Sequence, residues 1–459
     1  MSMKNMSLTR IAKACGGVYY GSEEMKEQCV TGIAIDSRKI EEGFLFVALR
    51  GERVDGHSFV ASAYEKGAYA CLVEEMPEQK EGTYIVVDSC PQALKDIAEY
   101  YRRSLDIKVI GITGSVGKTS TKEMITSVVS QKYNVQKTQG NFNNEIGVPL
   151  TIFSIREEHE VAVLEMGINE FGEMHRLSKM VRPDICVMTN IGLCHLENLK
   201  SRDGILQAKS EIYDFVKENC IAILNGDDDK LITLKSREAI HPKFYGLEAG
   251  NDIYVENIVD KGLEGIQCDI VSKDGRIPVW IPIPGMHMVY NALAGAQVGL
   301  ELGLTLEEIK AGIEALKPTG GRNHILKVND MTVIDDCYNA NPVSMRSSLD
   351  VLAKVKGRKV AILGDMGELG AEEKQLHYGV GEYAAGMNVD VLVCVGVLSM
   401  EMKKAAESVN NSKTIVLYYE DRDSMIGELS KFVMAGDTVL VKASHFMGFE
   451  KVVNELKKS

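Results

Sequence analysis

The sequence lacks the features that would place it in a membrane, on a nucleic acid or in an oxidising compartment. No stretch approaches the roughly 18 apolar residues of a membrane span, and the first residues hold no apolar signal core. Basic residues are too few to offset the acidic ones, and the net charge of −13 argues against a nucleic-acid surface. None of the ten cysteines forms a C-x-x-C pair, so neither a zinc knuckle nor a redox pair is indicated. We expect a cytoplasmic protein with reduced thiols, no membrane span and no nucleic-acid partner.

Long repeats, low-complexity tracts and coiled-coil heptads are also missing. The glycine-rich stretch GDMGELG at 364–370 lacks the G-x-G-x-x-G pattern and does not indicate a dinucleotide site. What remains is an ordinary globular composition, with 45% hydrophobic and 25% charged residues. A chain of 459 residues then suggests roughly three domains.

The most informative stretch is GITGSVGKTS at 111–120, which lies between an apolar β-branched run and a segment with helical spacing. Strand, glycine turn and helix in this order predict a phosphate-binding loop, because backbone N–H groups and the positive end of the helix dipole point at one place. We expect Lys118 to reach the terminal phosphates, and Thr119 or Ser120 to present a hydroxyl to Mg²⁺. The usual pattern G-x-x-x-x-G-K-[ST] has glycine where this chain has Ile112, so we interpret the loop as a variant, with an ordinary glycine turn as the alternative.

Three later segments carry reactive side chains. The apolar run VAVLEMG at 161–167 contains Glu165, and a carboxylate that ends a strand beside a phosphate loop is the usual second Mg²⁺ ligand. His195 lies just beyond the next apolar run and could on its own equally be structural. The segment AKSEIYDFV at 208–216 predicts an amphipathic helix with Lys209 on its polar side.

Alternating strand and helix patterns predict an α/β protein of three domains. Residues 1–104 are expected to form a small α/β domain, residues 105–316 a P-loop-type ATPase domain with a parallel sheet, and residues 317–459 a Rossmann-like α/β domain. The clearest boundary is KPTGGRNHIL at 317–326, where proline and glycines interrupt the pattern before alternation restarts.

Polar turns offer further candidate sites. Asp36-Ser37-Arg38 and Asp55-Gly56-His57 each follow a predicted strand of the first domain, where ligand contacts collect in α/β sheets. Solvated turns are an equally good interpretation of both. After the first helix of the second domain, four amide side chains flank glycines, which indicates either turn chemistry or a hydrogen-bonding surface for a polar ligand: Gln139, Asn141, Asn143 and Asn144.

Taken together, these motifs resemble those of the Mur ligases, which join amino acids or peptides to a growing cell-wall precursor. The resemblance extends over essentially the whole chain and rests on the order and spacing of six motifs: TGSVGKTS at 113–120, LEMG around Glu165, HLENL at His195, YNALA around Asn291, Gly321-Arg322 and DDCYNANP at 335–342. Val116 replaces the asparagine that is common in the family loop, a change that binding through backbone N–H groups should tolerate.

Within the family, the chain most resembles the member that forms the last amide bond, through the stretches at 36–60, 140–149 and 336–345. The resemblance implies ATP and Mg²⁺ as cofactors, UDP-N-acetylmuramoyl-tripeptide as the acceptor, D-alanyl-D-alanine as the incoming dipeptide and an acyl-phosphate intermediate. Residues 1–104 would bind the acceptor, and residues 317–459 would bind the dipeptide and close on ATP. A monomer is expected, and lysine or meso-diaminopimelate as the third acceptor residue stays open.

The resemblance also implies roles for individual residues. It assigns catalysis to Lys118, Glu165, His195 and Lys209; ATP contacts to Gly114, Ser115, Val116, Gly117, Lys118, Thr119, Ser120, Asn291, Arg322 and Asp336; and acceptor contacts to Ser37, Arg38, Asn141 and Asn144. One Mg²⁺ would be held by Thr119 and Glu165, and a second by His195 and Lys209, provided that the lysine is carbamylated into an anionic oxygen ligand.

Two alternatives stay open. One is another Mur-type ligase that adds a single amino acid, such as glutamate or a diamino acid, although the D-N-P-[RA] stretch typical of the latter is missing. The other is a nucleotide switch without ligase chemistry, which would use Lys118 and Thr119 but would have little need for the remaining catalytic and ATP-contacting residues.

Overall fold

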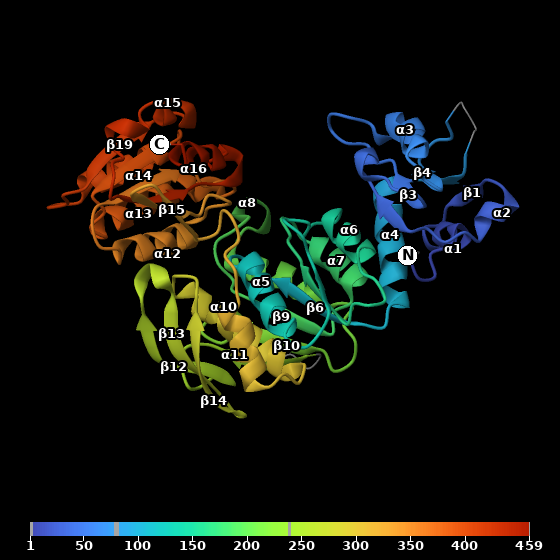
Figure 1. Cartoon of the computed structure of the whole chain (residues 1–459), viewed down its shortest axis with the longest axis horizontal. Coiled ribbons are helices and arrows are strands. Elements are labelled where there is room, and N and C mark those ends of the chain that lie inside the picture. The colour runs from blue at the N-terminus through green and yellow to red at the C-terminus, as the bar shows by residue number, and fades with distance from the viewer. Residues whose placement is uncertain (1–2, 78–81, 237–239, 459) are drawn as a thin grey trace.

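The computed structural model describes residues 3–77, 82–236 and 240–458, which fold into three lobes (Figure 1). The N-terminal lobe (blue) and the C-terminal lobe (orange to red) stand on opposite sides of the central lobe. Among the described residues, each lobe has its own β-sheet, with five, nine and six strands in chain order. The predicted three-domain α/β architecture is therefore confirmed. Each sheet lies within one predicted range, and the domain boundaries themselves stay predictions.

The first lobe has the strand order β1-β5-β4-β3-β2, with parallel neighbours except for the antiparallel pair β1 and β5. Its last helix, α4, begins after Ser89, whose side chain accepts a hydrogen bond from the backbone N–H of Gln92. Tyr101 on this helix donates to the carbonyl of Ile155 at 2.7 Å and thereby ties the first lobe to the central one. The elements are β1 (Val18–Tyr20), β2 (Gly32–Ala34), β3 (Phe44–Val47), β4 (Ala70–Val73), β5 (Tyr84–Val86), α1 (Leu8–Ala14), α2 (Glu23–Lys26), α3 (Val60–Glu65) and α4 (Cys90–Ser104).

The central sheet has the order β14-β13-β12-β11-β10-β9-β6-β8-β7. Neighbours from β7 to β12 run parallel, as predicted, but β13 pairs antiparallel with both β12 and β14. The predicted parallel sheet thus carries an antiparallel extension at this edge, because the residues between β13 and β14 leave no room for a crossover helix. The strands are β6 (Lys108–Thr113), β7 (Val135–Lys137), β8 (Val161–Glu165), β9 (Ile185–Met188), β10 (Ile221–Asn225), β11 (His241–Tyr245), β12 (Ile253–Asp260), β13 (Ile266–Ser272) and β14 (Gly275–Ile281).

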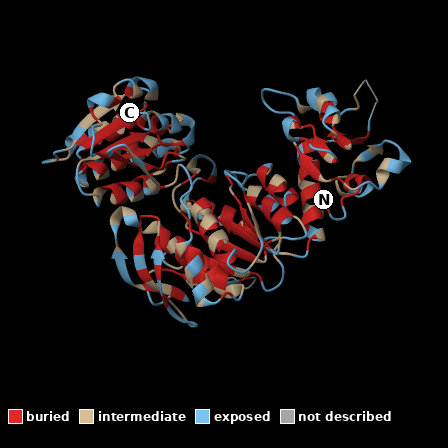
Figure 2. Cartoon of the chain, in the orientation of Figure 1, coloured by how far each residue is buried: buried red, intermediate tan, exposed pale blue. Residues whose placement is uncertain are grey.

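The helices of the central lobe hold the candidate phosphate loop in place. They are α5 (Lys118–Val129), α6 (Gly147–Phe153), α7 (Glu173–Val181), α8 (Leu196–Leu199), α9 (Arg202–Ser210), α10 (His287–Glu301) and α11 (Leu306–Glu314). Helix α5 packs closely on α10, since a Cβ on Gly295 would already lie 3.0 Å from Met124 Cγ. The strands β6, β8 and β9 behind these helices are buried almost throughout (Figure 2), as their continuous apolar runs predict. A close-packed core therefore fixes the start of α5.

The third lobe has the strand order β15-β16-β20-β17-β18-β19, with parallel neighbours except for the edge strand β15. Its elements are β15 (His324–Val328), β16 (Met331–Asp335), β17 (Lys359–Gly364), β18 (Val391–Val395), β19 (Ile415–Tyr419), β20 (Thr438–Lys442), α12 (Pro342–Ala353), α13 (Glu373–Gly386), α14 (Ser399–Ser408), α15 (Arg422–Ile426) and α16 (Glu450–Leu456). In the three described ranges, no helix is both long and apolar enough to cross a membrane.

Candidate active site

Two glycines give the loop between β6 and α5 its shape. Gly114 has φ +148°, and a Cβ there would lie 1.9 Å from Thr189 Oγ1, so neither the backbone conformation nor the space admits a side chain. Gly117 has φ +86° and stands at the start of α5. The chain therefore turns sharply into the helix and directs the first helical N–H groups toward one point, which is the geometry of a phosphate loop.

The middle of this loop is held by the segment after β9. Ser115 N donates to the carbonyl of Asn190 at 3.0 Å, and Val116 N donates to Asn190 Oδ1, also at 3.0 Å. Val116 O in turn accepts from Thr189 Oγ1 at 2.6 Å. Since these bonds involve the backbone of residue 116, its side chain is free to vary, which accounts for valine at this position.

The first residues of α5 meet a carboxylate. Lys118 Nζ donates to the carbonyl of Gly114 at 2.9 Å and so lies over the loop. Thr119 Oγ1 donates to Glu165 Oε2 at 2.8 Å, and Asn143 Nδ2 donates to Glu165 Oε1 at the same distance. Glu165 is 2% exposed and ends β8, as the sequence predicts. A hydroxyl and a buried, correctly oriented carboxylate therefore lie next to the phosphate loop.

Lys209 is buried completely, so the prediction that it lies on the polar side of a helix at 208–216 is wrong. The helix is α9, which begins at Arg202 behind the capping side chain of Ser201 and ends at Ser210, and its inward face includes Lys209. Among the described residues, Lys209 Nζ has no hydrogen-bond partner. Burial, and secondarily the charge of Lys118, lowers the Lys209 pKa to about 7.

His195 connects the central lobe to the third lobe. Its backbone adopts the left-handed conformation, with φ +49°, and its Nδ1 lies 2.8 Å from Glu368 Oε2. Glu368 belongs to the loop after β17. The hydrogen bond from His195, assisted by the charges of His195 and Lys118, holds the pKa of the Glu368 carboxyl below its usual value. The third lobe therefore places an anionic side chain beside the catalytic candidates.

The three predicted nucleotide contacts outside the loop lie in different places. Asn291 Oδ1 accepts from Thr121 Oγ1 at 2.9 Å and lies beside the phosphate loop. The Arg322 guanidinium stacks on the ring of Tyr338, 4.1 Å from its centroid. Asp336 is buried within the third lobe, where its carboxylate accepts from Lys442 Nζ and Ser348 Oγ, each at 2.5 Å. Only Asn291 is thus brought directly to the loop.

The predicted acceptor contacts form local structure. The Arg38 guanidinium pairs with Asp36 at 2.8 Å, and its hydrogen bonds lower the Asp36 pKa to about 2. Ser37 between them is buried. Asn144 Oδ1 accepts from the backbone N–H groups of residues 146 and 147 at the start of α6, while Asn141 is exposed. The structure does not bring these four residues into contact with the phosphate loop. In the second polar turn, His57 Nε2 accepts a hydrogen bond from the backbone N–H of residue 74.

Sequence reasoning misses several residues that shape the site. Asn143 stands in the predicted amide cluster, but the pattern cannot single it out from its neighbours. Asn190 follows a buried strand, and Lys122 on α5 is 1% exposed and donates to the carbonyl of Thr138 at 2.7 Å. The sequence signal that could have pointed to Glu368 is the glycine-rich stretch at 364–370, which does not match a dinucleotide-binding motif.

The donor set suits Mg²⁺ held together with substrate phosphates. In the described part of the chain, no three His, Cys, Asp or Glu side chains gather into a metal cluster. Thr119 and Glu165 instead offer hard oxygen donors next to a phosphate loop, the arrangement in which Mg²⁺ is bound by one or two protein groups and by phosphates. The Nζ of Lys209, buried without a hydrogen-bond partner among the described residues, is a polar atom that a further group would satisfy. These residues therefore fit the implied metal.

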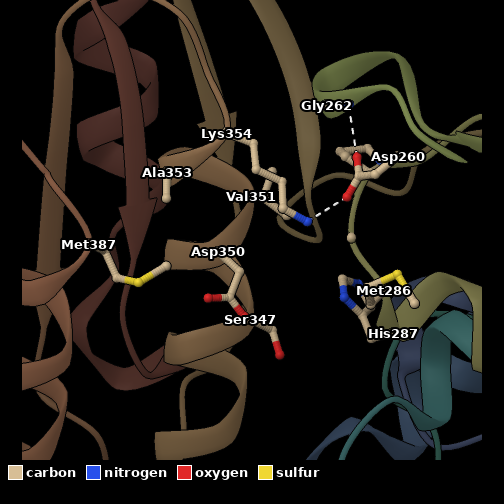
Figure 3. Close-up of a pocket in the computed structure, with 12 residues that line it drawn as sticks. Asp260, Gly262, Met286, His287, Ser347, Asp350, Val351, Ala353, Lys354 and Met387 are labelled. Carbon is tan, nitrogen blue, oxygen red and sulfur yellow. Dashed lines mark hydrogen bonds and ion pairs between the residues drawn. The ribbon is translucent and has the colours of Figure 1, made fainter.

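A separate cavity of about 220 Å³ lies between the central and third lobes (Figure 3). Met286 and His287 at the start of α10 face Ser347 and Asp350 of α12 across it, and Lys354 bridges the lobes through Asp260 at 2.5 Å. None of the predicted site residues lines this cavity.

Comparison with known proteins gives a consistent result along the chain. Residues 29–104 match the Mur ligase family, catalytic domain; residues 112–299 match the Mur ligase middle domain; and residues 321–445 match the Mur ligase, glutamate ligase domain.

Individual relatives agree over their full length. UDP-N-acetylmuramoyl-tripeptide--D-alanyl-D-alanine ligase of Bacillus subtilis (strain 168) is 37% identical over 441 residues, which cover 95% of this chain and 95% of that protein. The ligase of the same name from Escherichia coli (strain K12) is 32% identical, and the match covers 100% of this chain and 99% of that protein. The crystal structure of MurF from Acinetobacter baumannii has a TM-score of 0.89 at 32% identity, with 100% of both chains covered. MurF ligase from Thermotoga maritima in complex with ADP has a TM-score of 0.81 at 31% identity, with 93% and 97% covered.

Proposed function

The chain belongs to the Mur ligase family, and from this premise we propose how its residues divide the work of the reaction. It is an ATP-dependent carbon–nitrogen ligase that adds D-alanyl-D-alanine to UDP-N-acetylmuramoyl-tripeptide, a step of peptidoglycan precursor synthesis. A carboxylate does not react with an amine at neutral pH. Transfer of the ATP γ-phosphoryl group to that carboxylate gives an acyl phosphate, which the dipeptide amine attacks with loss of phosphate.

The observation that carries the residue assignment is the meeting of Lys118, Thr119 and Glu165 at the start of α5. Phosphoryl transfer depends on positioning and charge neutralisation more than on covalent help from the protein. Lys118 and the loop N–H groups neutralise charge on the terminal phosphates, and Asn291 helps to hold the nucleotide beside the loop. We assign Arg322 and Asp336 of the third lobe to the nucleotide, so that movement of that lobe would complete the site and exclude water from the acyl phosphate.

Thr119 and Glu165 would hold one Mg²⁺, and His195 and carbamylated Lys209 a second. When bound, such ions offset the charge that builds up on the phosphoryl oxygens. The protein prepares these positions itself, because Asn143 fixes the Glu165 carboxylate and burial fixes Lys209.

Lys209 is carbamylated in this assignment. Its neutral amine adds to CO₂, so that a C–N bond forms and one proton leaves, and the cationic side chain becomes an anionic oxygen ligand. The lowered pKa of Lys209, about 7, supports the step, since burial favours the neutral amine that adds to CO₂. The Nζ atom has no hydrogen-bond partner among the described residues, so the modification would break no hydrogen bond there.

The acceptor and the dipeptide bind on different lobes. Ser37, Arg38, Asn141 and Asn144 contact UDP-N-acetylmuramoyl-tripeptide, and the third lobe receives D-alanyl-D-alanine. We assign the chain to the cytoplasm, where nucleotide-linked precursors are made, and to a monomeric state, since each lobe supplies its own part of one site.

A mass-spectrometric assay tests the reaction. The enzyme is offered ATP, Mg²⁺, D-alanyl-D-alanine and the acceptor with either lysine or meso-diaminopimelate as its third residue. We expect the UDP-N-acetylmuramoyl-pentapeptide, with phosphate released only when acceptor and dipeptide are both present. Product formed instead from a single amino acid would assign the chain to another Mur-type ligase. Slow phosphate release regardless of both substrates would indicate a nucleotide switch.

A further inference from the structure

Glu368 has no part in the mechanism described so far, yet it reaches the centre of the site. It lies in the loop after β17 and extends from the third lobe to His195 of the central lobe, where the oxygen–nitrogen distance is 2.8 Å. Its side chain is 66% exposed despite this contact. One carboxylate oxygen is therefore engaged, and the group as a whole stays open to a ligand.

The loop that carries Glu368 is held in place on the third lobe. Met366 N donates to Nε2 of the buried His377 at 2.9 Å, and Gly367 N donates to Ser444 Oγ at 2.9 Å. Because both bonds hold backbone N–H groups just before Glu368, they fix the position of the Glu368 backbone. Glu368 is therefore presented by a rigid support and is not carried on a freely moving loop.

Backbone strain also singles out this residue. Of the eleven described non-glycine residues with positive φ, seven are asparagines, which tolerate that conformation. His195 and Glu368, at φ +49° and +61°, are among the other four, and their side chains meet. Strained residues of this kind persist at functional sites, where the surrounding structure holds them.

The charges around Glu368 show what it is suited to bind. Lys118 lies within electrostatic range of Glu368. The other carboxylate of the site, Glu165, already accepts hydrogen bonds on both oxygens. The amine of D-alanyl-D-alanine arrives mainly as a cation, since an α-amino group has a pKa of about 8. Lys118 repels that cation, and a carboxylate of the third lobe offsets its charge.

We propose that Glu368 binds the ammonium group of the incoming dipeptide beside the acyl phosphate. The proposal rests on the proposed function, because it assumes that the amine attacks next to the phosphate position marked by Lys118. The third lobe then does more than close the site, since it brings the dipeptide amine with it. His195 holds the Glu368 carboxylate in a fixed orientation while the ligand binds.

Hydroxylamine separates the two halves of the reaction. It is a small neutral nucleophile that converts an acyl phosphate into a hydroxamate without the dipeptide. The full-length enzyme and its Glu368→Gln variant are compared for hydroxamate formation, for KM of each substrate, and for inhibition by D-lactoyl-D-alanine, in which a hydroxyl replaces the amine. Glu372→Gln serves as the matched control, because Glu372 is an exposed glutamate on the same segment.

Glu368→Gln should raise KM for D-alanyl-D-alanine by roughly 10- to 100-fold, the range expected for a hydrogen bond to a charged group. Hydroxamate formation, KM for ATP and the acceptor, and inhibition by D-lactoyl-D-alanine should stay within about twofold of the wild type. The control should match the wild type throughout.

Three results would overturn the proposal. Equal losses of hydroxamate and of pentapeptide would mean that Glu368 acts only through His195 or through contact between the lobes. An equal loss of affinity for D-alanyl-D-alanine and for D-lactoyl-D-alanine would mean that the carboxylate does not recognise the amine. An unchanged variant would remove Glu368 from the site. Absence of hydroxamate with the wild-type enzyme would instead refute the acyl-phosphate chemistry of the proposed function itself.

Discussion

The phosphate-loop region and the Asp36–Arg38 turn carry similar polar side chains but are built in opposite ways. Around the loop, Thr119 and Glu165 bond each other across distant parts of the chain and are buried. In the turn, Arg38 bonds the side chain two residues before it, and its own side chain is 85% exposed. Reacting groups need a position fixed by tertiary structure, whereas a turn proposed only to recognise a substrate can rest on local geometry.

The largest effect should come from the centre of the loop region. We expect Lys118→Ala to lower kcat by a factor on the order of 10² to 10⁴, because the variant loses the charge that offsets the transferring phosphoryl group. The fold should persist, since Lys118 is only partly buried and its Nζ bonds a carbonyl of its own loop, that of Gly114. Phosphate release measured with all substrates tests the expected loss of kcat. A near-wild-type rate would refute the phosphate-loop assignment.

Two buried lysines of the central lobe test whether burial alone marks a reacting group. Lys122 donates to the carbonyl of Thr138 and pairs with Glu123, whereas Lys209 has no hydrogen-bond partner in the described chain. Lys122→Met should lower the free energy of unfolding by about 1–3 kcal/mol, because the Thr138 carbonyl loses its partner. Lys209→Met should abolish activity and, in CO₂-free buffer at pH 7, should raise the free energy of unfolding, because the wild type buries an uncompensated charge.

The pH dependence of stability has a definite sign for Lys209. Its pKa is about 7 in the folded protein, against 10.5 ordinarily, so between these values the unfolded chain binds one more proton than the folded one. The wild type should therefore gain stability relative to Lys209→Met as the pH rises from about 7 toward 10. Denaturant titrations of both proteins over this range measure the difference. A constant difference would show that Lys209 does not titrate inside the fold.

A test for carbamylation distinguishes Lys209 from Lys122 more directly. With ¹³C-labelled bicarbonate, the wild type and Lys122→Met should both show a carbamate carbon signal, and Lys209→Met should show none. Full activity of Lys209→Ala, together with an unbranched Nζ in an ATP-bound crystal structure, would refute the modification.

The sequence predicts the loop region well where the information is local. Strand, turn and helix follow from periodicity and glycine spacing, and Glu165 follows from its place at the end of an apolar run. The sequence does not predict the features that depend on tertiary contacts. The capping residue Ser201 starts α9 earlier than the apolar pattern suggests, and Lys209 lies on the buried face of this helix. Glu368 meets His195 only because two lobes come together, and no pattern along the chain records that contact.

The site also depends on the third lobe, which the stretch 318–321 connects to the central one. We expect this lobe to move as a rigid body about that stretch, because a few loop residues absorb the backbone change. Small-angle scattering should show a smaller radius of gyration with an ATP analogue and acceptor than without them. Lys118→Ala is the matched control, since a loop that cannot hold the phosphates should not promote closure. Identical profiles for the wild type in both states would count against closure.

The smallest effect should come from substitutions in the Asp36–Arg38 turn, and it should be limited to binding of the acceptor. We expect Ser37→Ala and Arg38→Ala to raise KM for the acceptor by roughly 2- to 10-fold, the loss of one or two hydrogen bonds, while KM for ATP and kcat change little. Selectivity follows from the geometry, because the turn makes no contact with the phosphate loop and its ion pair is exposed. Lys39→Ala is the control, since this exposed neighbour is not an expected contact. If the Arg38 variant weakens ATP and acceptor equally, the turn supports the fold of the first lobe and does not recognise the substrate. If it lowers kcat as Lys118→Ala does, the contrast between a reacting centre and a recognition surface would no longer hold.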